Sequence, residues 1–197
     1  MASLSGLSIV KTLEDRRIKF ISSVEFTRLF KFNNPNTAIR SIQRLSKSGH
    51  LKRLMKDKYV FTGSQYNDFE LANYLVNPSY VSFESALSFY GILPQFTYTI
   101  TSATTKRSKK TFLIKEFEFT HIDDSLYWGF EKNKNYLIAR PEKAILDQIY
   151  LSTKGLRGLD VDDLDLSALN KDLLKVYANK INNQRVTAFL FENKLLE

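Results

Sequence analysis

The residues best suited to chemistry in this sequence lie between positions 36 and 47, where amide and cationic side chains recur at helical spacing. Amide and guanidinium groups hydrogen-bond to base edges, and ammonium groups neutralise phosphates, so this set predicts contact with nucleic acid in a major groove. No carboxylate interrupts the set. Its members, called here the base-contacting face, are Asn36, Thr37, Arg40, Gln43, Arg44 and Lys47.

A second set of cations follows in the segment LKRLMKDKYVFTG, residues 51–63. Its pattern predicts two short strands around the turn Lys56-Asp57-Lys58, and we call this segment the basic hairpin. Cations on such a hairpin are expected to hold phosphates beside a groove, without reading bases. The phosphate-contacting residues predicted here are Lys52, Arg53, Lys56 and Lys58, together with Lys47.

Carboxylates elsewhere in the chain offer an enzymatic alternative, a metal-dependent nuclease. Glu116 and Glu118 share a face of a predicted strand, but carboxylates that alternate with phenylalanine are typical of a half-buried strand. His121 with Asp123 is interpreted as a surface pair, and Trp128 as a core residue. With no cysteine and two histidines, the chain is expected to hold no metal and no cofactor and not to be an enzyme. The other ionisable residues of this alternative are Glu84, Asp123, Asp124 and Lys143.

Two earlier helices are expected to pack against the apolar side of the helix that carries the base-contacting face. Ser22 followed three positions later by Glu25 forms a capping box and predicts the start of a helix that ends near Phe32. An earlier helix is indicated by apolar residues at approximate helical spacing. The apolar residues assigned to the two inward faces are Leu4, Leu7, Ile9, Val10 and Leu13, and then Val24, Phe26, Leu29 and Phe30.

The helix that carries the base-contacting face has signals at both ends. Pro35 suits its first position, because the proline nitrogen lacks the hydrogen that would be unpaired there, and Gly49 is expected to close it. Its inward side is assigned to Ala38, Ile39, Ile42 and Leu45. Two helices around a tight turn, followed by a hairpin, predict a winged helix-turn-helix.

The charge of the chain is concentrated in the same segment. The net charge is +8, and residues 1–63 hold 13 Lys and Arg against four Asp and Glu, whereas residues 64–197 hold 16 against 17. A local excess of this kind is typical of a surface that meets a polyanion. No long apolar run and no signal-peptide pattern occur, so we expect a cytoplasmic protein without membrane contact.

The rest of the chain predicts a domain of mixed α/β content. Helices are expected within 80–94, from Pro141, within 160–180 and around Val186, and strands over 97–104 and 112–122 with the basic turn TTKRSKKT between them. The acidic run 160–165 is expected to cap helices or to dock on a second copy. The expected fold class is therefore α+β, with a winged helix-turn-helix over 1–70 and a C-terminal domain over 71–197.

Several segments together resemble the AbiEi-type antitoxins of bacterial type IV toxin-antitoxin, or abortive-infection, systems. The resemblance rests on the winged-helix start, YVSFESALSFYGILP (80–94), TITSATTKRSKKTF (99–112) and LIARPEKAILD (137–147), in the order and spacing of that family. It implies a repressor that binds inverted repeats in its own promoter and whose C-terminal domain neutralises a nucleotidyltransferase-like toxin in phage defence.

The resemblance also implies a partner surface in the C-terminal domain. The segments that carry it contribute Thr105, Lys106, Arg107, Lys109, Lys110, Arg140, Glu142 and Lys143, and also Ser82 and Glu84. The expected partners are double-stranded promoter DNA, the toxin and a second copy of the chain on DNA. The alternative to an antitoxin is a winged-helix regulator whose C-terminal domain senses a small molecule.

Overall fold

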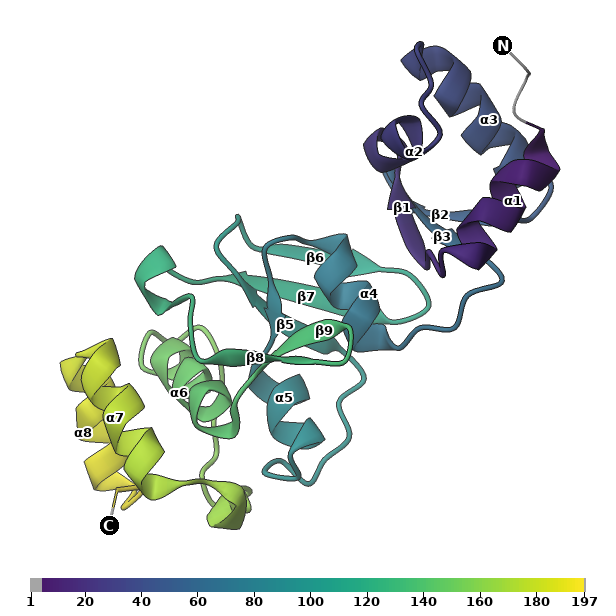
Figure 1. The fold of residues 1–197 in the computed structure, drawn as a ribbon. Helices are drawn as coiled ribbons and strands as arrows, with labels where there is room; N and C mark the ends of the chain where they lie inside the picture. The colour runs from purple at the N-terminus through teal and green to yellow at the C-terminus, as the bar shows by residue number, and fades with distance from the viewer. Residues whose placement is uncertain (1–4, 197) are drawn as a thin grey trace. The chain divides into compact units, whose positions relative to one another are not determined.

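The computed structural model describes residues 5–196 of the chain. These divide into two compact units, which we call unit 1 and unit 2; unit 1 ends at Asn67 and unit 2 begins at Asp68. Helices and a sheet occur in both units, so the fold class is α+β (Figure 1). A boundary after residue 70 would cut the first helix of unit 2, α4 (Asp68–Leu75).

Unit 1 packs three helices against a small antiparallel sheet. Its elements are α1 (Gly6–Asp15), β1 (Phe20–Ser22), α2 (Ser23–Leu29), α3 (Pro35–Lys47), β2 (Leu51–Met55) and β3 (Lys58–Phe61). The strand order is β1-β3-β2, with β3 antiparallel to both neighbours. Leu13, Phe26, Ile42 and Leu51 are fully buried, so each helix and the sheet contribute to one core.

Three apolar residues of unit 1 are exposed, where the sequence pattern assigned them inward. Leu7, Val24 and Ile39 expose 81%, 56% and 43% of their surface. On α3 the buried side is formed by Ala38, Ser41, Ile42 and Leu45, at the spacing i, i+3, i+4 and i+7 of one helix face. The assignments of Leu7, Val24 and Ile39 were therefore wrong, and Leu4 lies outside the described residues.

Unit 2 is built on a mixed six-stranded sheet in the order β6-β7-β5-β4-β9-β8. Pairs β5–β7 and β4–β9 are parallel, and the other neighbours are antiparallel. The strands are β4 (Tyr80–Val81), β5 (Ile100–Thr104), β6 (Lys109–Phe112), β7 (Glu116–His121), β8 (Phe130–Asn133) and β9 (Tyr136–Ala139). Lys109 and Lys110, expected in a turn, belong to edge strand β6.

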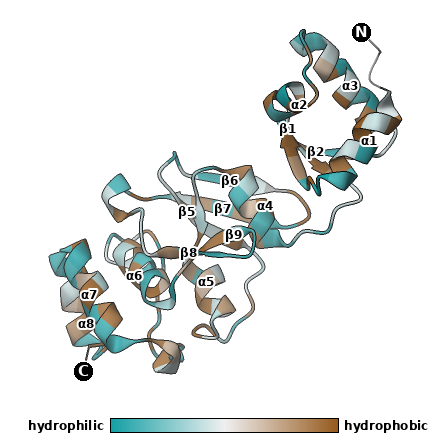
Figure 2. Ribbon diagram, viewed as in Figure 1, coloured by the Kyte–Doolittle hydropathy of each residue, from teal (hydrophilic) through white to brown (hydrophobic). Residues whose placement is uncertain are grey.

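One central helix organises the helical side of unit 2. Helix α6 (Pro141–Ser152) is buried along residues 142–151, between α5 (Phe83–Phe89), which packs beside it, and α7 (Lys171–Ile181) with α8 (Gln184–Glu192) (Figure 1). The short helices η1 (Asp124–Leu126) and η2 (Leu166–Ala168) lie in connections. Hydrophobic positions on α7 and α8 alternate with hydrophilic ones (Figure 2), as expected for helices with one covered face. No helix within residues 5–196 has the length and hydropathy needed to cross a membrane.

Candidate nucleic-acid interface

All six residues of the base-contacting face are exposed on α3. The opposite side of the helix is fixed in the core by Ala38, Ile42 and Leu45, each no more than 3% exposed. Burial of one apolar stripe therefore sets the rotation of α3 and turns the amide and cationic side chains to solvent. The side chains that α3 presents are suited to a groove that displays hydrogen-bonding base edges between phosphates.

Both ends of α3 are held by local hydrogen bonds. At the start, the side chain of Asn34 accepts from the amide of Asn36 at 2.8 Å, and Pro35 occupies the first turn as the sequence predicted. At the end, Gly49 has a φ of +79°, and the amide of His50 donates to the carbonyl of Leu45 at 2.9 Å. This bond, with that from Gly49 to Ser46 at 3.2 Å, forms a Schellman motif.

The basic hairpin is formed by β2 and β3, joined at Lys56 and Asp57. Asp57 has a φ of +59°, its carbonyl accepts from the amide of Ser23 at 3.2 Å, and its carboxylate accepts from the Ser23 hydroxyl at 3.2 Å. These bonds tie the hairpin turn to the start of α2. Of the predicted phosphate contacts on the hairpin, Lys52, Arg53 and Lys56 are exposed and Lys58 is half-buried.

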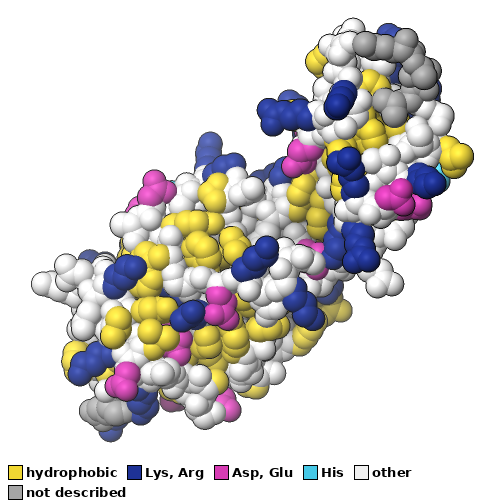
Figure 3. Space-filling model, in the orientation of Figure 1, with side chains coloured by type: hydrophobic (Ala, Val, Ile, Leu, Met, Phe, Trp, Pro, Cys, Tyr) yellow, Lys and Arg dark blue, Asp and Glu magenta, His cyan; other side chains and the backbone are white. Residues whose placement is uncertain are grey.

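The cations of α3 are available to an external anion. Within the described residues, none of Arg40, Arg44 and Lys47 forms an ion pair with a carboxylate; the Arg44 guanidinium donates to the Ser41 hydroxyl at 3.1 Å. In Figure 3, Lys and Arg side chains outnumber Asp and Glu side chains on the visible face of unit 1. Unpaired cations repel one another, so this surface favours binding of a polyanion.

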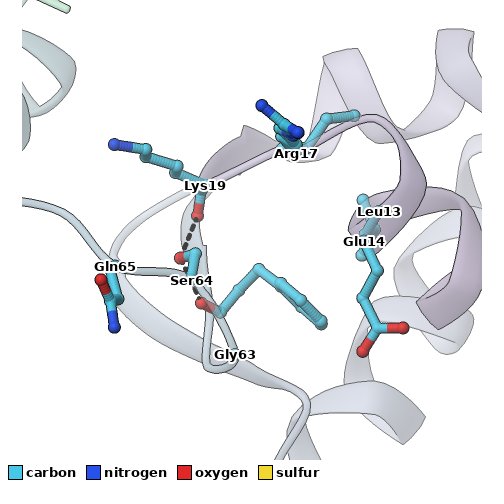
Figure 4. A pocket seen from close by; sticks show the side chains of 9 residues that line it. Leu13, Glu14, Arg17, Lys19, Gly63, Ser64 and Gln65 are labelled. Carbon is cyan, nitrogen blue, oxygen red and sulfur yellow. Dashed lines mark hydrogen bonds between the residues drawn. The ribbon is translucent and has the colours of Figure 1, made fainter.

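Unit 1 also contains a pocket of about 290 Å³. It lies between the end of α1 and segment 63–65 (Figure 4), and its lining includes the apolar residues Leu13, Ile18 and Phe61. The Ser64 hydroxyl closes one wall by donating to the carbonyl of Phe61 at 2.6 Å. Its volume is at the lower end of the range usual for small-molecule sites, about 300–1,000 Å³.

The structure separates the predicted partner surface of unit 2 into exposed and buried residues. Lys106, Arg107, Lys109, Lys110 and Arg140 are exposed, and Thr105 is half-buried. Lys110 pairs with Glu118 at 2.7 Å, and Arg140 pairs with Glu131 at 3.2 Å. Glu142 and Lys143 are 4% and 0% exposed, so placing them on a surface was wrong.

Lys143 is the centre of a buried polar cluster. Its ammonium group forms an ion pair with Asp147 one turn later and donates to the Tyr80 hydroxyl at 3.0 Å. Asp147 in turn accepts from the hydroxyls of Tyr80 at 2.9 Å and Ser82 at 2.8 Å. Ser82 is the N-cap residue of α5, but its side chain forms no capping hydrogen bond there and is used in this cluster instead. Burial, followed by the charge of Asp147, raises the pKa of Tyr80 well above its ordinary value.

Two more residues fix this cluster. Trp128 is half-buried, and the ammonium groups of Lys143 and Lys180 lie 5.2 and 4.2 Å from its ring centre. Gly129, at a φ of +75°, passes so close that an added Cβ would lie 2.9 Å from Cγ of Lys143. The carboxylate of Glu142 accepts from the Asn170 amide at 2.9 Å and so fixes the start of α7. Glu142 and Lys143 therefore have structural contacts inside unit 2.

Two acidic residues of the nuclease alternative, Glu84 and Glu118, form ion pairs with one arginine. Arg157 donates to Glu84 at 2.7 and 2.5 Å, forms an ion pair with Glu118, and lies 4.4 Å from the ring centre of Phe83. Within residues 5–196, no group of three or more His, Cys, Asp or Glu side chains is arranged to hold a metal ion. The sequence offered no signal for Arg157, because this residue lies in a long connection and is far from both glutamates along the chain.

Two smaller expectations for acidic residues have different outcomes. His121 Nδ1 contacts the carbonyl of Lys106 at 3.2 Å, and Asp123 accepts from the Tyr150 hydroxyl at 3.1 Å, so His121 and Asp123 do not form the expected pair. In the acidic run, Asp165 caps η2 by accepting from the Ser167 amide at 3.0 Å. That carboxylate thus has the local capping role that was one of its two interpretations.

The chain matches no protein-family model, and no curated protein is significantly similar to it.

Proposed function

We propose that this protein binds double-stranded DNA sequence-specifically through a winged helix-turn-helix in unit 1. The order helix, strand, helix, helix and hairpin is that of this motif, and α3 is then the recognition helix. The observation that carries the proposal is the base-contacting face, exposed along its whole length and free of carboxylates. The hydrogen bonds between Asp57 of the basic hairpin and Ser23 of α2 support the proposal that the hairpin is a wing in a fixed position.

The residues of this surface divide between base contacts and phosphate contacts. Arg40 and Arg44 carry planar guanidinium groups that suit the two acceptors of guanine, and Asn36 and Gln43 carry amides that suit adenine. Thr37 adds a hydroxyl near the start of the helix. The lysines of α3 and the basic hairpin, with Arg53, neutralise phosphates and set the register on the duplex.

The test of this proposal is binding to duplexes from the protein's own promoter region in competition with random duplexes. Arg40→Ala and Arg44→Ala are each expected to weaken specific binding by about 1–3 kcal/mol. Lys11→Ala is the matched control, since it removes one exposed cation from α1 and leaves α3 intact. If both arginine variants bind as tightly as the control, α3 is not the recognition helix.

We further propose that the protein is an autorepressing antitoxin, as the resemblance to AbiEi-type antitoxins implies, and that unit 2 neutralises a nucleotidyltransferase-like toxin. In support, the three resembling segments of unit 2 pack on one another. Ser82 contacts Asp147, and the Thr101 hydroxyl donates to the carbonyl of Ser82 at 2.7 Å, so the three segments form one core. Co-expression with a growth-arresting nucleotidyltransferase from the neighbouring gene tests this: failure to restore growth contradicts it.

A further inference from the structure

The turn between β5 and β6, residues 105–108, is held in place at both ends. The Thr104 hydroxyl donates to the carbonyl of Pro78 at 2.6 Å and accepts from the amide of Lys106 at 3.1 Å. On the other side, the Ser108 hydroxyl accepts from the amide of His121 at 2.9 Å. The cations on this turn are therefore presented by a fixed backbone.

His121 is oriented by the same turn. Its Nδ1 lies 3.2 Å from the carbonyl of Lys106, and because a carbonyl oxygen only accepts, Nδ1 must carry the hydrogen in this contact. In the neutral ring Nε2 then carries no hydrogen and can only accept. Arg107, Ser108 and His121 together line a concavity at the surface.

The charge around this concavity is positive and largely unneutralised. Lys106 and Arg107 are exposed and form no ion pair within the described residues, whereas the nearby Lys110 is paired with Glu118. The closest acidic residue along the chain beyond His121, Asp123, is held by the Tyr150 hydroxyl. A guanidinium group beside a hydroxyl group is a combination that suits a phosphate.

We propose that this turn is a second DNA contact, which binds backbone phosphates of a duplex through Lys106 and Arg107. Every residue lining the concavity is exposed, so a small ligand would remain mostly in water, whereas a polyanion gains from several such contacts through counterion release. The choice of duplex DNA rests on the proposed function of unit 1. Once unit 1 binds a duplex, the chain that connects the two units keeps this turn at a high effective concentration relative to the same duplex.

The test uses the full chain carrying Arg40→Ala and Arg44→Ala, so that contacts of α3 no longer dominate. Affinity for a random-sequence duplex is measured by fluorescence anisotropy over a range of salt concentrations. Adding Lys106→Ala and Arg107→Ala is expected to weaken binding about 3–10-fold and to lower the salt slope by about 2. The control adds Lys132→Ala and Lys175→Ala, which removes two exposed cations elsewhere in unit 2. It is expected to change the affinity for the duplex less than about 2-fold.

Equal losses in the two pairs would overturn the proposal, since they would show a general effect of charge. Amide spectra of the same protein add a site-specific readout: the random duplex is expected to shift the signals of Ser108 and His121. Shifts with inorganic phosphate but not with the duplex would assign the site to a small phosphorylated molecule, and tighter binding of single-stranded RNA would assign it to RNA. Either result would overturn the duplex contact. These measurements use a protein that lacks Arg40 and Arg44 and a duplex of random sequence. A negative result would therefore reject the second contact without bearing on the proposal that α3 is the recognition helix.

Discussion

Among single residues, Lys143 and Asp147 form a buried ion pair in unit 2. Lys143→Met leaves Asp147 buried beside Tyr80 and Ser82 without its counter-charge, and is expected to lower the free energy of unfolding by about 3–5 kcal/mol. Lys143→Met with Asp147→Leu removes both charges and is expected to cost less than the sum of the two single variants. Urea unfolding of the wild type, the two single variants and the double variant measures this coupling. Strictly additive losses of the free energy of unfolding would contradict it.

Glu118 makes the stability of unit 2 depend on pH. Its partial burial favours the neutral form, but the hydrogen bond from Lys110 and the charge of Arg157 outweigh burial and lower its pKa below the ordinary 4.5. The unfolded chain therefore takes up this proton at a higher pH than the folded chain. Its contribution to stability is present above pH 4.5 and is lost as pH falls through the lowered folded pKa.

Glu118→Gln should accordingly flatten the acid side of the stability profile. The variant is expected to lose less free energy of unfolding than the wild type between neutral pH and a pH below 4.5, measured by urea unfolding at each pH. Glu192→Gln, at an exposed carboxylate of α8, is the control. A profile for Glu118→Gln as steep as that of the wild type would contradict the role of Lys110 and Arg157.

At the scale of elements, the end of α3 depends on Gly49. Its left-handed backbone has open space around it, so an added methyl group would meet no atom within 4 Å and would cost only backbone strain. Gly49→Ala is expected to lower the stability of unit 1 by about 1–2 kcal/mol without changing the base-contacting face. Thermal unfolding followed by circular dichroism measures the loss. No loss in that measurement would contradict the Schellman termination.

The elements of unit 1 were largely predictable because their signals are local. The capping box at Ser22 and Glu25 is present with both hydrogen bonds, and Pro35 and Gly49 bound α3 as expected. Periodicity alone did not separate Ile39 from the buried face, because a residue at the edge of an apolar stripe is decided by what packs against it.

The polar interior of unit 2 was not predictable from the same signals. Lys143 and Glu142 stand at the start of a helix, where charged residues are ordinarily solvated, and only the packing of α5 and α7 around α6 buries them. Arg157 joins Glu84 to Glu118 across long stretches of chain. Contacts of this kind depend on tertiary structure, and a single sequence shows no periodicity that reports them.

At the scale of the whole molecule, the division at Asn67 and Asp68 separates the two proposed functions. Each unit has its own hydrophobic core, so residues 1–67 are expected to unfold cooperatively by themselves and to retain the sequence preference of the full chain. Calorimetry and competition binding of this fragment are the measurements. A fragment that is folded but has no sequence preference would show that reading DNA requires unit 2.

The most direct test of DNA recognition by α3 is a map of amide chemical-shift changes when promoter duplex is added to the full chain. We expect the largest changes on residues 36–47 of α3 and on the basic hairpin around Lys56, and smaller changes on α3 with a random duplex at the same concentration. If α3 is unaffected by both duplexes, it does not recognise DNA.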